Sequence, residues 1–192
     1  LIFMTGPLTG TVFPTTARYE VCTKSPLTNM WLATSSAGWW ARDFKLAGYD
    51  GLIVEGAADS PVYLWIHDGQ AEIKDASDLW GLDSDQTQEV IRRELGDEKI
   101  RVSCIGQSGE MQIPLACIMN DEQRAAGRGG SGAVMGSKKL KAVAVRGTKR
   151  VPVADEATLK DAAKTVRAIL KEHPVVSQFT PYGTASLLEE SW

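Results

Sequence analysis

Cysteine and histidine are scarce in this sequence, which has three cysteines and two histidines among 192 residues. The cysteines, Cys22, Cys104 and Cys117, are widely spaced, and no two of them form a CxxC pair. Because apolar residues surround each one, we interpret them as reduced core residues, which favours a cytoplasmic protein over a secreted one. His67 is expected in a hairpin and His173 at a helix end, and we assign neither a catalytic role.

Long apolar runs are also missing. No stretch approaches the roughly 20 residues that a helix needs to cross a bilayer, and no signal segment stands at the start. We therefore expect no insertion into a membrane. The sequence begins inside an apolar run, LIFMTGPLTG, and stops after a helical-looking segment, so we interpret both ends as cut.

The overall charge is low, with a formal net charge of -3, and it gives no reason to expect nucleic acid as a partner. The charge is unevenly distributed, however. From residue 124 to residue 150 there is no acidic residue, and eight are basic: Arg124, Arg128, Lys138, Lys139, Lys141, Arg146, Lys149 and Arg150. We expect this stretch to hold an anion.

Short apolar runs separated by glycine and proline fill the first 150 residues, a pattern typical of strands and loops. Strands are predicted at residues 1–4, 19–23, 52–55, 62–67, 71–74, 100–105, 111–119 and 142–146. Because these strands do not alternate regularly with helices, the predicted fold class is α+β, rich in β-sheet and with antiparallel hairpins.

Helical spacing of apolar residues occurs at residues 85–95 and 155–172, and a shorter helix is predicted at residues 40–46. The helix at 155–172 follows Val151-Pro152-Val153, which suggests a boundary near residue 150. We predict a β-rich N-terminal domain in residues 1–150, followed by the beginning of a helical domain in residues 151–192.

The segment with the most chemical information is RAAGRGGSGAVMGSKKLKA, residues 124–142. Its glycines let the backbone turn tightly and approach a ligand, while Arg124 and Arg128 supply guanidinium groups suited to phosphate. The segment therefore predicts a pyrophosphate cradle. The alternative is a tight glycine loop with solvated lysines.

Two familiar phosphate loops do not fit this segment. GRGGSG satisfies GxGxxG, but a dinucleotide-binding fold needs a strand directly before it and an acidic residue about 20 positions later, and neither is present. The sequence contains no GK[ST], so a Walker loop is excluded.

Two earlier segments are also candidates for ligand contact. In residues 6–28, Arg18 and Lys24 flank an apolar strand as further anion donors, or are plain surface cations. In WLATSSAGWW, residues 31–40, small residues permit a flat ligand to lie close to the backbone. Trp39 and Trp40 either wall such a ligand or belong to the core.

Several stretches, taken in order, resemble the aldehyde:ferredoxin oxidoreductase family. They are GPLTGT, RYxVxTKSPLT, FKLAGYDGLIVEGAADSPVYL, DASDLWG, ACIMND and AAGRGGSGAVMGSKKLKAVAVRG, and the likeness continues to YGTA at residues 182–185. The long glycine segment is the most specific part. The resemblance implies the N-terminal domain of a tungsten-containing enzyme: a β-sheet base that carries a tungsten bis-molybdopterin cofactor, under helical domains that close over it.

The resemblance also implies which side chains bind the cofactor. Arg18 and Arg124 match arginines that contact the pterin phosphates. Arg128 lies inside the same motif and has the chemistry either to bind phosphate or to form a structural ion pair.

Backbone contacts are implied at four further positions. Ser35 and Ala125 match positions whose backbone carbonyls hold a magnesium ion that bridges the phosphates, and Ala37 and Gly127 match close backbone contacts. The family commonly has Asn-Ser-Gly-Gly where this chain has Ser-Ser-Ala-Gly at residues 35–38. A backbone contact tolerates such a change better than a side-chain contact does.

By the same resemblance, the enzyme oxidises an aldehyde to a carboxylic acid and passes electrons through a 4Fe-4S cluster to ferredoxin or a similar carrier. The cluster ligands of the family form a CxxCxxxC run and a distant cysteine, beyond the region that this chain covers. The catalytic groups near the metal also lie mainly in later domains, so this chain leaves the catalytic residues unknown. A homodimer or a larger complex is a further family expectation.

Three alternatives stay open. One is a tungsten-dependent reductase of aromatic acyl-thioesters from the same superfamily, although SPLT and the intact AAGRGG look closer to the aldehyde type. Another is a non-catalytic anion- or nucleotide-binding module that uses the basic glycine loop, although the aromatic residues lie outside that loop. The third is a structural piece that requires a full-length partner.

Overall fold

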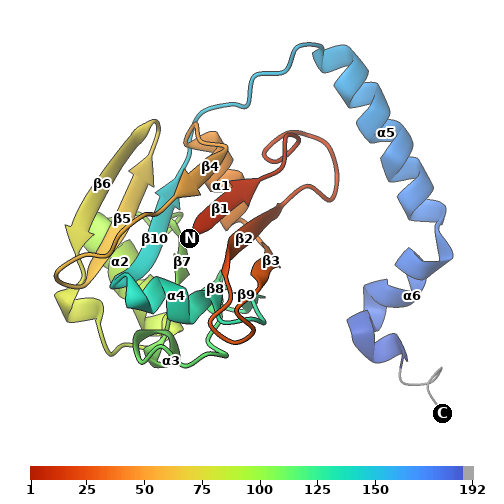
Figure 1. Cartoon of the computed structure of the whole chain (residues 1–192). Helices are drawn as coiled ribbons and strands as arrows, with labels where there is room; N and C mark the ends of the chain where they lie inside the picture. Colours follow the sequence, from red (N-terminus) through yellow and green to blue (C-terminus); the bar gives the residue numbers. More distant parts are fainter. Residues whose placement is uncertain (188–192) are drawn as a thin grey trace. The chain divides into compact units, whose positions relative to one another are not determined.

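The computed structural model describes residues 1–187, which belong to two compact units (Figure 1). The first unit contains Leu1–Thr11 and Thr16–Val151, and the second contains Val12–Thr15 and the chain from Pro152 onward.

The first unit is built on two β-sheets (Figure 1). The four-stranded sheet is antiparallel throughout and has the order β3-β2-β1-β4, with β1 Ile2–Thr5, β2 Arg18–Lys24, β3 Trp31–Ala37 and β4 Gly51–Ile53. The six-stranded sheet has the order β6-β5-β10-β7-β8-β9, and only the pair β10 and β5 is parallel. Its strands are β5 Val62–His67, β6 Gln70–Asp75, β7 Arg101–Cys104, β8 Ile118–Asn120, β9 Arg124–Ala126 and β10 Leu140–Arg146.

Strand β10 lies inside the six-stranded sheet and is buried on both faces. Successive side chains of a strand point to opposite faces, so its LKAVAVR sequence supplies two cores. Val143 and Val145 belong to one core, whereas Ala142 and Ala144 belong to the other. The apolar run therefore reflects burial on both sides.

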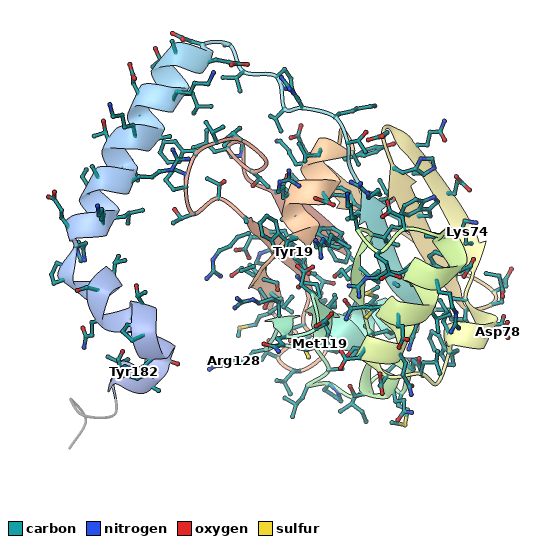
Figure 2. The ribbon with its side chains drawn as sticks, turned by 180° about the vertical axis from the view of Figure 1, so that it is seen from behind. Tyr19, Lys74, Asp78, Met119, Arg128 and Tyr182 are labelled. Atoms are coloured by element: carbon teal, nitrogen blue, oxygen red, sulfur yellow. The ribbon has the colours of Figure 1, made fainter. Side chains whose placement is uncertain are left out.

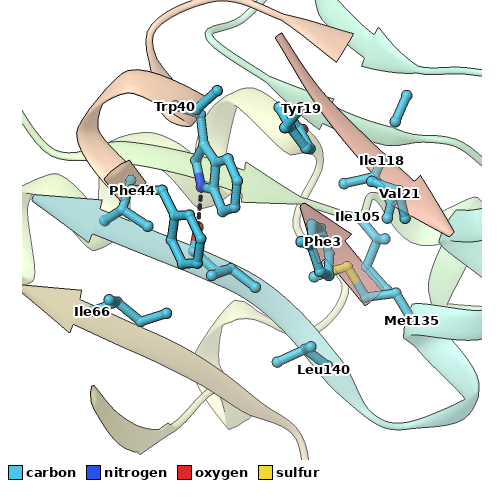
Figure 3. Packing of buried hydrophobic residues seen from close by; sticks show 14 of the residues in the cluster. Phe3, Tyr19, Val21, Trp40, Phe44, Ile66, Ile105, Ile118, Met135 and Leu140 are labelled. Carbon is cyan, nitrogen blue, oxygen red and sulfur yellow. Dashed lines mark hydrogen bonds between the residues drawn. The ribbon is translucent and has the colours of Figure 1, made fainter. Parts of the chain in front are cut away.

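Aromatic rings fill the core that the two sheets share with helix α1, Trp40–Leu46 (Figure 3). Trp40 is fully buried, with its ring 4.5 Å from that of Tyr19 and 5.1 Å from that of Phe44 between centroids. Its Nε1 donates a hydrogen bond of 2.8 Å to the carbonyl of Val143 (Figure 3). Removing a buried ring of this size costs about 3–5 kcal/mol, so Trp40 is a principal anchor of the fold.

Helix α2, Ser84–Leu95, packs over the second core through the buried Ile91. Asp83 caps it in a reciprocal capping box with Gln86, and Gly96 ends it in a left-handed conformation with φ of 71°. Three shorter helices complete the first unit: η1 Ser77–Leu79, α3 Gln107–Glu110 and α4 Ser131–Ser137.

The second unit is helical. Helix α5, Glu156–Glu172, is capped by Asp155, and α6, Pro174–Tyr182, and η2, Gly183–Leu187, follow. Within this unit Arg167 donates a hydrogen bond to the carbonyl of Val12. No helix of residues 1–187 is both long enough and apolar enough to span a membrane.

The α+β class rich in sheet is confirmed, as are the helices predicted near residues 40–46, 85–95 and 155–172. The strand predicted at residues 111–119 is wrong, because only Ile118–Asn120 is a strand and the preceding residues form turns. The alternation of Met111, Ile113 and Leu115 imitated a strand, but all three side chains are exposed. Strands β3 and β9 and the short helices α3 and α4 were not predicted from the sequence.

Candidate functional site

The seven residues predicted to contact a cofactor lie on neighbouring segments of the first unit. Arg18 begins β2 and pairs in register with Ala37 at the end of β3. Ser35 lies two residues earlier on the same face of β3, and its Oγ accepts a hydrogen bond of 3.4 Å from Arg18 Nη1. Antiparallel pairing thus joins three of the seven predicted residues directly.

The other four predicted residues follow one another along β9 and the loop after it. Arg124 and Ala125 are exposed on β9, where they pair with Asn120 and Met119 of β8. Gly127 and Arg128 come next, and Arg128 projects from the surface of this unit (Figure 2). We refer to Arg18, Ser35, Ala37, Arg124, Ala125, Gly127 and Arg128 together as the cradle.

Strands β3 and β9 are edge strands of two different sheets, and they lie beside each other (Figure 1). An edge strand leaves the N–H and C=O groups of its outer side without partners in the ladder. The cradle therefore has backbone donors and acceptors as well as guanidinium groups.

Four of the eight cations between residues 124 and 150 have partners within the protein. Lys141 is fully buried and paired with Glu110, while Arg146 Nε is 2.7 Å from Asp97 Oδ2 and holds the pKa of Asp97 below its usual value. Lys138 and Lys139 each donate a hydrogen bond of 2.7 Å to a backbone carbonyl. These four residues contribute to the fold, so they are not free to bind an anion.

Arg124 and Arg128 differ from these cations. Both are exposed, and neither side chain forms a hydrogen bond or an ion pair with any residue in the described part of the chain. Together with the exposed Arg18 of β2, they are the guanidinium groups within the cradle that can bind an external anion.

The glycines of residues 127–136 are not equivalent. A Cβ atom would lie 2.4 Å from Leu32 Cδ1 at position 129, and 2.3 Å from the carbonyl oxygen of Pro114 at position 130. At Gly132 and Gly136 it would lie 2.3 Å and 1.9 Å from backbone carbonyl oxygens of neighbouring segments. Only at Gly127, among these five, would a Cβ have nothing within 4 Å. Four glycines thus permit close packing of the protein itself, and one faces open space.

Of the two adjacent tryptophans, one belongs to the core and the other could contact a ligand. Trp40 belongs to the core, whereas Trp39 is 56% exposed and lies 6.0 Å from the guanidinium carbon of Arg42. Trp39 is therefore available to a ligand, and Trp40 is not.

Sequence reasoning missed a buried polar network beneath the cradle, centred on Asn120. This residue is fully buried, and its carboxamide bonds to Tyr19, Ser36, Ala37 and Asp121. Burial raises the pKa of the Tyr19 phenol, which keeps it protonated as a hydrogen-bond donor. The signal available in the sequence was Asn-Asp, two polar residues between an apolar run and the glycine segment.

The cysteines differ in their surroundings. Cys104 is buried, and burial raises the pKa of its thiol to about 12. Cys22 and Cys117 are only partly buried, so the interpretation as core residues holds for Cys104 alone. All three are free thiols, and within residues 1–187 no group of three or more His, Cys, Asp or Glu side chains is placed to hold a metal ion.

The chain is similar to known proteins over nearly its whole length. Residues 1–147 match the family model described as "Aldehyde ferredoxin oxidoreductase, N-terminal domain". The tungsten-containing aldehyde ferredoxin oxidoreductase of Pyrococcus abyssi is 49% identical over 189 residues, which are 98% of this chain and 31% of that protein. The corresponding protein of Pyrococcus furiosus is also 49% identical over the same shares of the two chains.

More distant relatives have other described activities. The aliphatic sulfonate oxidoreductase, WOR-like subunit, of Pyrococcus furiosus is 36% identical, over 97% of this chain and 31% of that one. A solved structure, the active site complex BamBC of benzoyl coenzyme A reductase with 1,5-dienoyl-CoA, superposes with a TM-score of 0.87 and 40% identity. It covers 89% of this chain and 26% of the other, so in each comparison this chain spans about a third or less of its relative.

Proposed function

Because the chain belongs to the aldehyde ferredoxin oxidoreductase family, we propose that it forms the cofactor-binding base of a tungsten-dependent enzyme that oxidises aldehydes to carboxylic acids. The observation that carries the proposal is the cradle, in which three exposed arginines lie on or next to the edge strands of two adjoining sheets. Residues 1–150 would be the tungstopterin-binding domain, and residues 151–192 the beginning of a helical domain.

The residues of the cradle fit a pterin cofactor that carries phosphate groups. Phosphate requires charge-assisted donors, and Arg18, Arg124 and Arg128 supply planar guanidinium groups for it. The open space at Gly127 would admit the ligand close to the backbone. These features support Arg18, Arg124 and Arg128 as phosphate contacts and Ala37 and Gly127 as backbone contacts.

A magnesium ion between the phosphates would need oxygen ligands. Ser35 and Ala125 belong to the edge strands β3 and β9, so their backbone carbonyls are suitable candidates. Magnesium commonly combines one or two protein ligands with phosphate oxygens and water. Two backbone carbonyls would therefore be a sufficient contribution from the protein.

The tungsten cofactor would supply the redox chemistry, and this chain would bind and orient it. We place the catalytic groups, the ligands of the 4Fe-4S cluster and the contact with ferredoxin or a similar carrier in the remaining two thirds of the enzyme. We further propose a cytoplasmic protein that acts as a homodimer or within a larger complex.

A second candidate is the reduction of an aromatic acyl-thioester, which the likeness to benzoyl coenzyme A reductase supports. The identity is 40% to that enzyme and 49% to aldehyde oxidoreductases, and it therefore favours the aldehyde reaction. Parallel assays with an aldehyde and with an aromatic acyl-CoA would separate the two.

The test of the proposal is the metal and phosphate content of the full-length enzyme, purified without air. Arg124→Glu would place a carboxylate beside the phosphates. Losing a charge-assisted bond of about 1.5–3 kcal/mol should weaken cofactor affinity about tenfold or more and so lower the tungsten content. Arg18→Glu should act in the same direction.

Arg93→Glu is the matched control, because Arg93 is an exposed arginine on α2, outside the cradle. We expect this variant to keep its tungsten. If Arg124→Glu retained tungsten and pterin at the level of the unchanged enzyme, the assignment of the cradle would be wrong. If the wild-type enzyme held no metal, a non-catalytic anion- or nucleotide-binding module would replace the proposed function.

A further inference from the structure

The carboxamide of Asn120 uses its full hydrogen-bonding capacity. Its Oδ1 accepts hydrogen bonds of 2.6 Å from Ser36 Oγ and 3.0 Å from Tyr19 Oη. Its Nδ2 donates hydrogen bonds of 2.9 Å to the carbonyl of Ala37 and 3.0 Å to Asp121 Oδ2. An asparagine with two acceptor sites and two donors filled in a buried site is held in one orientation.

Asn120 and its hydrogen-bond partners lie next to cradle residues on β2, β3 and β9. Tyr19 follows Arg18 on β2, and Ala37 is itself a cradle residue on β3. Asn120 ends β8 and pairs in register with Arg124 of β9. The buried side chain of Asn120 therefore connects β2 and β3 to β8, the strand that pairs with β9.

Asp121 makes a second connection between the same segments. Its Oδ2 accepts hydrogen bonds of 2.6 Å from the backbone N–H of Trp39 and 3.2 Å from that of Trp40. Its other oxygen is 4.0 Å from Arg101 Nη1. The contact is so close that a Cβ at position 38 would lie 2.1 Å from Asp121 Oδ2, and Gly38 has φ of 113°. This position therefore requires glycine, although the residues before it differ from the common family pattern.

These two residues make the hydrogen bonds that join residues 35–40 to the hairpin of β8 and β9. Strands β3 and β9 share no ladder hydrogen bonds, since they belong to different sheets. Every hydrogen bond that the structure records between residues 35–40 and residues 118–128 involves Asn120 or Asp121. Ser25, whose Oγ donates a hydrogen bond of 2.7 Å to the carbonyl of Gly129, adds a connection farther along the loop.

We propose that Asn120 and Asp121 are positioning residues, which set the separation and orientation of the two halves of the cofactor site without touching the cofactor. The inference rests on the proposed function. Backbone groups have no rotamers with which to adapt, so ligand contacts through Ser35, Ala37, Ala125 and Gly127 require the two strands to be held in place. The Asn120 and Asp121 side chains supply that constraint.

The test uses the full-length enzyme with Asn120→Ala, and with Asp121→Ala and Asp121→Asn as a pair. Asp121→Asn keeps an oxygen that accepts from Trp39 and Trp40, whereas Asp121→Ala removes it. Ser103→Ala is the control, because Ser103 Oγ is 3.0 Å from Tyr19 Oη in the same buried network but has no recorded hydrogen bond to either edge strand.

Two quantities are measured: tungsten per chain, and amide hydrogen exchange of residues 35–40 and 124–128 in enzyme prepared without tungstate. Loss of an outer-shell partner typically lowers metal affinity about 10–100-fold. We expect Asn120→Ala and Asp121→Ala to bind the cofactor more weakly by a factor in this range, to retain less tungsten, and to exchange faster in both segments together. Asp121→Asn and Ser103→Ala should retain tungsten and slow exchange.

The inference is overturned if Asn120→Ala retains tungsten and exchanges as the unchanged enzyme does. It is also overturned if Ser103→Ala loses as much tungsten as Asn120→Ala, because general loosening would then explain the loss. If Asn120→Ala fails to fold, the comparison of Asp121→Ala with Asp121→Asn tests the inference. Equal tungsten content in these two variants would contradict it. An unchanged enzyme without tungsten would instead contradict the proposed function.

Discussion

At the scale of single residues, the glycines of the cradle segment differ in what their missing side chains permit. Gly136 of α4 allows the backbone of Gly109 to come close, and Gly127 leaves space that the protein does not fill. A methyl group at each position therefore tests two separate properties, packing and ligand access.

Gly127→Ala should leave the free energy of unfolding within about 1 kcal/mol of its original value, because the methyl group meets no atom within 4 Å and the backbone is not left-handed. Gly136→Ala should destabilise the protein by about 1–3 kcal/mol, because the fold must shift to relieve overpacking. Urea unfolding measures both changes.

Tungsten content adds a second comparison. We expect it to fall in folded Gly127→Ala enzyme, where the methyl group would meet the cofactor. A Gly127→Ala enzyme with full tungsten occupancy would show that the cofactor does not approach this residue.

Individual positions could be predicted from the sequence when a motif defined them, but their surroundings could not. The sequence of residues 124–142 indicated Arg124 and Arg128 as cations that could bind an anion. By the same criterion it indicated Lys141, which the structure places in a buried ion pair. Trp39 and Trp40 are adjacent and chemically identical, and only the direction of each side chain separates an exposed ring from a core ring. Asn120 depends on partners up to 101 residues away, which no local pattern specifies.

At the scale of elements, an ion pair between Lys141 and Glu110 joins the buried strand β10 to helix α3. Helix α3 in turn packs against α4. Lys141 Nζ also donates a hydrogen bond of 2.8 Å to the carbonyl of Leu82, and Glu110 accepts from the N–H of Gly81. Both charges are therefore buried with several partners.

Lys141→Met should lower the free energy of unfolding by about 3–5 kcal/mol, because it leaves the Glu110 carboxylate buried without a counter-charge. Adding Glu110→Gln removes that charge and should recover part of the loss. Unfolding in urea measures the two variants side by side. A loss below about 1 kcal/mol in Lys141→Met would mean that the pair behaves like an exposed one.

Elements with strong periodicity or caps were predictable, and elements defined by their partners were not. Helix α2 has a capping box and a C-terminal glycine in its own sequence, so its predicted bounds were nearly right. Strand β9 has three residues and exists because β8 pairs with it, while the small residues of β3 gave no strand signal.

At the scale of the whole molecule, the chain between β10 and α5 contains neither helix nor strand. Thr148, Lys149 and Arg150 are exposed there, and the boundary predicted near residue 150 falls in this interval. An exposed segment without regular structure is a preferred site of proteolysis.

Limited digestion of this chain with trypsin should therefore cut first after Lys149 or Arg150 and release a product that resists further digestion. Mass spectrometry of the early products identifies the site. Early cleavage inside β2 or β10, before any at residues 149–150, would contradict the predicted domain boundary.

The meeting of two edge strands also bears on how the protein behaves before it receives a ligand. Open edges are templates on which other chains add strands, and proteins usually protect them. Here β3 and β9 expose their edges at one place, and Trp31 of β3 is 70% exposed. A cofactor bound between these edges would cover them. It would therefore reduce aggregation in addition to supplying redox chemistry. Cells that lack tungsten should then accumulate this polypeptide as insoluble material.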